Sequence, residues 1–158
     1  MMKTIHTLCA VTLGLAAVTA QCPFAGVAQQ ANGLGCNPVF GSPPTVAVAL
    51  DTVNCLLNVT VAAFPGCCNT FLVGRMLVLG DQPAAVPLPW IGPGCTLFAN
   101  PVILLYQPTA AGATFVLTLP TAALPPLTFW LQGGAHYFTT IGLTHDFALS
   151  NGSQITLQ

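Results

Sequence analysis

Few side chains in this chain could perform acid–base or nucleophilic chemistry. Downstream of residue 20 the carboxylates and imidazoles available for acid–base catalysis are three aspartates and two histidines, namely Asp51, Asp81, Asp146, His136 and His145. General acid–base catalysis needs a positioned histidine or a pair of carboxylates. No GxSxG turn, HExxH motif or P-loop accompanies these residues. The sequence therefore predicts a protein that is not an enzyme, with no catalytic residue and no cofactor.

The two histidines lie on either side of Gly142, which permits a turn. His145 belongs to an alternating apolar series with Leu143, Phe147 and Leu149. On a strand it would point to the apolar side, where a buried polar group usually finds a partner, so a core histidine is expected. The alternative is that His136 and His145 meet across a hairpin as metal ligands. Two ligands fall short of a usual zinc site, and no metal site is predicted.

The first twenty residues have the pattern of a secretory signal peptide. Lys3 supplies a positive start, an uncharged run extends from Leu8 to Val18, and small residues precede a cut after Ala20. The run is shorter than the roughly 20 residues of a spanning helix, so an uncleaved anchor is the weaker alternative. We expect a cleaved leader over 1–20, a secreted protein located extracellularly or at the cell surface, and no membrane span in the mature chain.

Loss of that leader removes Cys9 and leaves an even set of cysteines: Cys22, Cys36, Cys55, Cys67, Cys68 and Cys95. Such a set in an exported chain is typical of a disulfide framework, although six cysteines allow 15 pairings. Cys67 and Cys68 are adjacent and cannot pair with each other without strain. The preferred set joins Cys22 to Cys36 across a Gly-rich loop. Each member of the adjacent pair then bonds to Cys55 or Cys95, in an order that stays open.

Charge is scarce along the whole chain. Only 3% of the residues are charged, whereas ordinary domains are about 25% charged. Phosphate neutralisation needs several Lys or Arg together, so nucleic acid and anionic membrane surfaces are excluded as partners. Low charge also weakens the repulsion between protein molecules, which predicts a homo-oligomer or polymer. The alternative left open is a monomer hydrated by Thr, Asn and Gln.

Short alternating or apolar segments separated by Gly and Pro fill the chain after residue 44. The expected strands span 45–50, 54–62, 71–79, 95–98, 102–106, 113–119, 127–132, 136–141, 143–149 and 153–157. Residues 80–94 are rich in proline and are expected to cross between two sheets. Arg75 interrupts the apolar run 71–79 and is expected to pair with an aspartate, with Asp81 as a candidate.

No segment shows a convincing helical period, and many short strands at regular spacing favour a sandwich. We predict an all-β protein, an antiparallel β-sandwich of Ig-like or jelly-roll-like type over 45–158. A disulfide-stapled, loop-rich N-terminal arm over 21–44 precedes it. Because the mature chain has no lysine to protect its strand edges, edge pairing or donation of this arm is the expected mechanism of association.

Several short motifs follow one another in the second half of the chain: FLVGRMLVLG over 71–80, GCTL over 94–97, a strand end with Leu117, Leu119 and Pro120, Pro126-Leu127 with Gln132, and LSNG over 149–152. Their order resembles a loosely defined group of small exported proteins that are abundant in planctomycetes and myxobacteria. Thr128 stands where a glycine is common in that group. The resemblance implies an exported β-sandwich whose biochemical function is unassigned.

Aromatic rings offer the strongest competing function. Small β-sandwiches bind glycans through exposed aromatics with polar neighbours, and Trp90, Trp130 and Tyr137 are available. Trp130 lies inside a strand, which favours core packing, whereas Trp90 lies among prolines. Binding pockets need convergent polar groups, and no Asp or Glu cluster is near. We therefore predict a non-catalytic structural or adhesive protein, with a carbohydrate-binding module that recognises a surface polysaccharide as the alternative.

Overall fold

The protein is described by a computed structural model that covers residues 22–37, 42–109 and 114–158. The leader predicted over 1–20 lies outside the described residues, so its cleavage stays a prediction. Within the described ranges no helix is long and apolar enough to cross a membrane.

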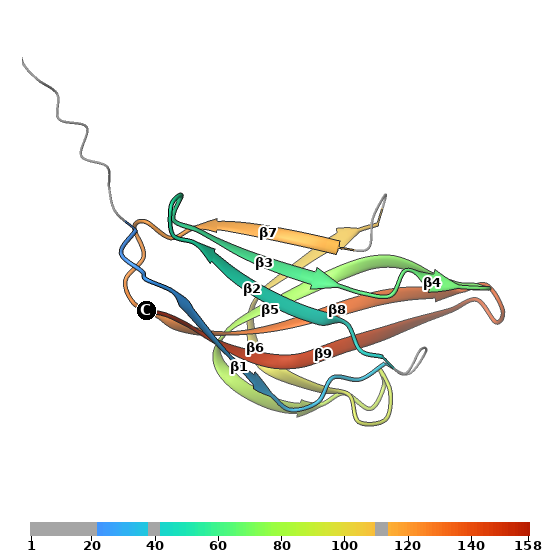
Figure 1. Cartoon of the computed structure of the whole chain (residues 1–158). Helices are drawn as coiled ribbons and strands as arrows, with labels where there is room; N and C mark the ends of the chain where they lie inside the picture. The colour runs from blue at the N-terminus through green and yellow to red at the C-terminus, as the bar shows by residue number, and fades with distance from the viewer. Residues whose placement is uncertain (1–21, 38–41, 110–113) are drawn as a thin grey trace, which may run out of the picture.

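Nine strands make up the described structure: β1 (Val27–Asn32), β2 (Thr45–Asp51), β3 (Leu56–Ala62), β4 (Gly66–Cys67), β5 (Thr70–Pro87), β6 (Thr96–Pro108), β7 (Thr114–Pro120), β8 (Thr128–Thr139) and β9 (Thr144–Leu157). The larger sheet has the order β1-β9-β8-β5-β4, with β6 also paired to β5, and the smaller sheet has the order β2-β3-β7. All pairings are antiparallel. The smaller sheet lies across the larger one (Figure 1), which confirms the predicted all-β antiparallel sandwich.

The core lies between the two sheets, and β3 shows how the sequence directs side chains into it. Leu57, Val59 and Val61 are buried, whereas the residues between them are only half-buried. Successive strand residues point to opposite faces, so one face of β3 is apolar throughout. These side chains pack with Leu77 of β5 and Leu131 of β8. Each fully buried aliphatic side chain contributes roughly 1.5–3 kcal/mol, which makes this layer the main source of stability.

The N-terminal arm contains a strand that its loop-rich composition does not predict. β1 pairs with β9 along its full length, from Val27 opposite Leu157 to Asn32 opposite Gly152. Gln29 adds side-chain hydrogen bonds to Ser153 Oγ at 3.0 Å and to the Val46 carbonyl at 3.2 Å. The arm therefore forms an edge strand of the larger sheet, because β9 offers it an unpaired edge.

β5 and β6 form a hairpin that the sequence did not predict. The expectation that 80–94 crosses between sheets is wrong, because β5 continues to Pro87 and the chain returns as β6 in the same sheet. Three register shifts between Leu79 and Val86 interrupt the ladder, and such bulges bend strands. The far half of the hairpin consequently lies over the outer face of β8 and β9 (Figure 1).

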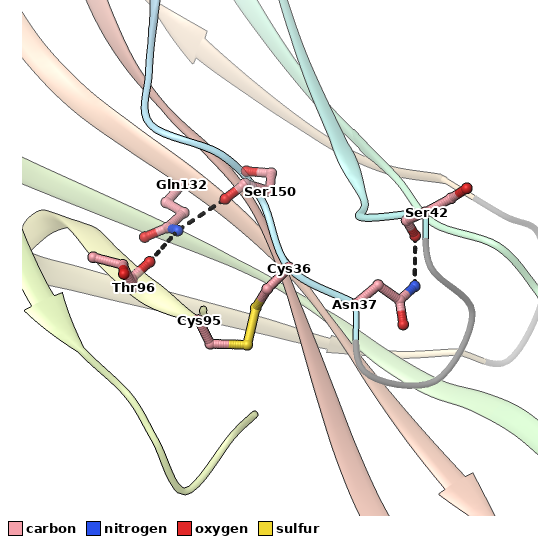
Figure 2. Close-up of a disulfide and its surroundings, with 7 residues drawn as sticks. All are labelled: Cys36, Asn37, Ser42, Cys95, Thr96, Gln132 and Ser150. Atoms are coloured by element: carbon pink, nitrogen blue, oxygen red, sulfur yellow. Dashed lines mark hydrogen bonds between the residues drawn. A yellow bond between two sulfur atoms is a disulfide. The ribbon is translucent and has the colours of Figure 1, made fainter. Parts of the chain in front are cut away.

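Gln132 holds the start of β6 on that outer face. Its side chain is fully buried, its Nε2 donates to the carbonyls of Thr96 and Ser150 at 2.9 Å each, and its Oε1 accepts from the Phe98 N–H at 2.8 Å. Figure 2 shows the Gln132 amide between Thr96 of β6 and Ser150 of β9, next to the disulfide. Unpaired buried amides are costly, so these three hydrogen bonds specify where β6 docks.

The disulfide contradicts the preferred pairing of Cys22 with Cys36. Cys36 bonds instead to Cys95, with Cα atoms 5.2 Å apart (Figure 2). Two backbone hydrogen bonds of 2.8 Å hold Cys36 opposite Leu149 of β9. The β5–β6 hairpin brings Cys95 to this same strand, β9. The docking of the hairpin therefore decides that Cys95 is the partner of Cys36, and the spacing of cysteines in the sequence does not reveal it.

Three pairs of predicted strands are each one continuous strand. β6 unites 95–98 with 102–106, β8 unites 127–132 with 136–141, and β9 unites 143–149 with 153–157. In β8 the sequence suggested a break at Gly133, but a Cβ there would lie 2.5 Å from Val46 Cγ2. Glycine at this position allows the two sheets to approach closely and does not end the strand.

Arg75 is buried in β5 with 1% of its surface exposed. Its electrostatic neighbour is Tyr137, and burial lowers the pKa of the guanidinium while raising that of the Tyr137 hydroxyl. Asp81, the candidate partner from sequence, is exposed and accepts a hydrogen bond from Asn100 Nδ2 at 3.3 Å. The predicted pairing of Arg75 with Asp81 is therefore wrong, because β5 places Arg75 in the interior and Asp81 at the surface.

Candidate functional site

The most distinctive surface of the protein is the outer edge of the larger sheet at β6. Among the described strands β5 is its only partner, so one side of the β6 backbone has no strand beside it. Val102 and Leu104 are 62% and 63% exposed, and Ile103 and Tyr106 are about half exposed. No charged residue occurs between Thr96 and Pro108. Natural edge strands usually carry a charge that prevents pairing with another chain, and β6 lacks that protection.

An apolar groove of about 340 Å³ lies beside this edge and is lined by residues of both sheets. Leu57 of β3 and Leu157 of β9 are buried in it, while Val102 and Ile103 of β6 line the side that is open to solvent. Asp81 is the one charged residue among those that line the groove. Because apolar surface gains from being removed from water, the groove and the β6 edge form one continuous surface suited to an apolar partner. We call this the β6 edge surface.

A row of polar rings crosses the outer face of the larger sheet. The Tyr106 hydroxyl lies 3.0 Å from His136 Nδ1, and His136 Nε2 lies 2.8 Å from His145 Nδ1. A side chain at Gly74 would overlap the Tyr106 hydroxyl, so glycine in β5 lets the tyrosine reach across to β8. His136 also stacks on Phe147, with ring centroids 4.6 Å apart.

The expectation of a core histidine at 145 is wrong. His145 is exposed, on the same outer face as Phe147. The inner face at this end is filled instead by Tyr137 with the small residues Ala135 and Ala148. The alternation in the sequence is present, but Phe147 and His145 lie on the outer face, while Tyr137 packs with alanines on the inner one.

The histidine pair does meet, as the metal alternative supposed. Burial, and then the charge of His145, lower the pKa of His136, so this imidazole favours its neutral form. No group of three or more His, Cys, Asp or Glu side chains gathers within 22–37, 42–109 and 114–158. Two imidazoles hydrogen-bonded to each other are fewer ligands than a usual zinc site provides.

The aspartates are engaged in local structure. Asp51 accepts hydrogen bonds from the N–H groups of Val53 and Asn54 at 2.9 and 3.0 Å and from Asn54 Nδ2 at 2.7 Å. The side-chain hydrogen bond from Asn54 is the main reason that the pKa of Asp51 is lowered. Asp146 accepts from the hydroxyls of Thr139 and Thr144 at 3.4 Å. These carboxylates therefore stabilise a turn and the β8–β9 hairpin.

The three aromatic residues considered for ligand binding differ in exposure. Trp90 is 76% exposed in the connection between β5 and β6, and Trp130 is half-buried in β8. Tyr137 is fully buried, and its hydroxyl donates to the Phe64 carbonyl at 3.1 Å. Tyr137 as a ligand-binding residue is thus a wrong prediction, because it lies on the inner face of β8.

Sequence reasoning missed the β6 edge surface. The stretch 102–106 was expected to be a strand, but its position at the edge depends on the β5–β6 hairpin, which was not predicted. The signal that was available is the absence of any charge over 96–108. A strand with one solvated face usually alternates apolar with polar residues, and 102–106 does not.

No protein-family model, no curated protein and no solved structure matches this chain.

Proposed function

We propose that this is an exported, non-catalytic structural or adhesive protein whose copies associate through the β6 edge surface at the cell surface or in an extracellular matrix. The observation that carries the proposal is the uncharged, apolar outer edge of β6, beside which no other described strand lies, with its exposed Val102 and Leu104. A second strand placed along β6 would satisfy its free backbone groups, and the side chains on both faces would gain burial.

Donation of the N-terminal arm is the less favoured mechanism. β1 is paired with β9 over six residue pairs in its own sheet, so donating it would break those hydrogen bonds. Pairing two β6 strands around a twofold axis gives a dimer, whereas pairing β6 with the opposite edge strand, β1, gives an open polymer. The mass of the assembly distinguishes the two arrangements.

The test is the mass of the protein in solution across a concentration series, for the wild type, Leu104→Lys and Val53→Lys. Val53 is 88% exposed in the β2–β3 turn, away from β6, so Val53→Lys adds the same charge as a matched control. Burying one leucine contributes roughly 1.5–3 kcal/mol, so Leu104→Lys should weaken association roughly 10- to 100-fold. A wild type that stays monomeric at all concentrations, or equal effects of the two variants, would overturn the proposal.

A carbohydrate-binding module is the second candidate, favoured by the exposure of Trp90. An exposed indole provides a flat apolar face with an N–H donor. This function predicts retention on a polysaccharide array, lost in Trp90→Ala and kept in Leu104→Lys. Equal retention of the wild type and Trp90→Ala would argue against it.

A further inference from the structure

Two cysteines outside the disulfide lie beside each other at the end of the sandwich where β3 begins. Cys22 packs against the core cluster, and Cys55 is buried immediately before β3. Each thiol shifts the pKa of the other, so the two side chains lie within reach of one another although 33 positions (55 − 22) separate them in the sequence.

Thr121 fixes this arrangement from the β7 side. It is fully buried, and both its N–H, at 2.8 Å, and its hydroxyl, at 2.9 Å, donate to the Cys55 carbonyl. The same hydroxyl lies 4.0 Å from Cys22 Sγ. One side chain therefore contacts both cysteines: it holds the backbone of Cys55 in place and lies against the sulfur of Cys22.

The other cysteines are poorly placed to be partners of Cys55. Cys36 and Cys95 are already joined. Cys67 and Cys68 are exposed in the β4–β5 hairpin, beyond the far end of β3 (Figure 1). At about 3.3 Å per residue, the seven residues of β3 alone place roughly 20 Å between them and Cys55. A disulfide requires Cα atoms within about 7 Å, so the sequence-based pairing of Cys55 with that adjacent pair does not fit.

We infer that Cys22 and Cys55 form a second disulfide, which binds the segment that precedes β1 to the β2–β3 turn. Together with Cys36–Cys95 it ties the segment that carries β1 at both of its ends. β1 would then be unable to leave its own sheet, and exchange of this strand between copies would be blocked.

Formation of the Cys22–Cys55 bond needs an oxidant, and a small-molecule disulfide such as oxidised glutathione supplies it. The Cys22 thiolate attacks one sulfur of the oxidant, which forms a mixed disulfide and releases one small thiol. Cys55 then attacks the Cys22 sulfur and releases the second thiol, which takes up the proton of Cys55. Cys22 suits the first step because it is only half-buried and hydrogen bonding from Cys55 lowers its pKa, whereas the pKa of Cys55 is raised to about 11.

Cleavage before aspartate maps the bridges, because the aspartates separate the cysteines. Cutting before Asp51, Asp81 and Asp146 leaves Cys22 and Cys36 in the fragment that ends at residue 50. Cys55, Cys67 and Cys68 fall in fragment 51–80, and Cys95 falls in fragment 81–145. The full chain is oxidised with glutathione, its free thiols are alkylated under denaturing conditions, and the unreduced digest is analysed by mass spectrometry.

The expected result is that the fragment ending at residue 50 is linked both to 51–80 and to 81–145. The link to 51–80 should persist when Cys67 and Cys68 are both replaced by serine, and should disappear in Cys22→Ser. Alkylated Cys22 and Cys55 in the oxidised wild type, a bridge within the first fragment, or loss of the link in the Cys67→Ser/Cys68→Ser variant would each overturn the inference. None of these outcomes depends on whether copies associate through β6.

Discussion

Replacing Cys36 and Cys95 together by serine removes the bridge that fixes the β5–β6 hairpin over β9. The two cysteines are 59 positions apart, and in the chain-entropy model a cross-link of this span lowers the entropy of the unfolded chain by about 14 cal/mol/K, or about 4 kcal/mol at 25 °C. Domains of this kind are stable by about 5–15 kcal/mol. The three hydrogen bonds of Gln132 remain, so the variant should still fold, with a much smaller margin.

Denaturation of dilute protein by urea and by heat measures this loss. For a chain of this size, about 4 kcal/mol corresponds to a fall in Tm on the order of 10–15 °C. Cys67→Ser/Cys68→Ser is the matched control, because both thiols are exposed, and it should change the unfolding free energy by less than about 0.5 kcal/mol. A loss below about 1 kcal/mol in Cys36→Ser/Cys95→Ser would refute the reasoning, since it would show that the unfolded chain is already constrained without the bridge.

Two further predictions concern a buried amide and a titrating ring. Gln132→Leu removes hydrogen bonds to the part-buried Phe98 N–H and to the buried Ser150 carbonyl. It should destabilise the fold by about 1–3 kcal/mol for each partner left without a hydrogen bond away from water. Urea denaturation tests this, and an unchanged midpoint would contradict it. The lowered pKa of His136 means that the unfolded chain binds its proton first as the pH falls below about 6.5, so stability should decrease there. The fall in denaturation midpoint between pH 7.5 and 5.5 should be smaller in His136→Gln, and equal falls would show that this ring does not couple to folding.

The strand content could be predicted because its cause is local. In β3 the alternation of Leu57, Val59 and Val61 with polar residues allows only one face to enter a core, and β2 and β7 were expected within one residue of their ends. Charge scarcity was equally visible, and the prediction of association depends on it. The place where association would occur was not visible, because β6 is an edge strand only through the order of strands in the folded sheet.

The row of polar rings on the outer face was predicted only in part, for the same reason. His136 and His145 were recognised as residues that a hairpin could bring together, and His136 Nε2 lies 2.8 Å from His145 Nδ1. Tyr106 was not connected with them, since it comes from β6 and reaches His136 only over Gly74 of β5. The alternation around His145 was right in period and wrong in direction, because a period of two does not say which face is the core.

The sequence by itself determined the class of fold, the strands that alternate and the near absence of charge, since each depends on residues within one segment. Only the tertiary structure decided that Cys36 joins Cys95, that Cys22 lies beside Cys55, that the arm becomes β1, and that β6 is left exposed. These outcomes bring together residues that are far apart in the chain. They are selected by the summed burial and hydrogen bonding of the whole sandwich, which no local pattern encodes.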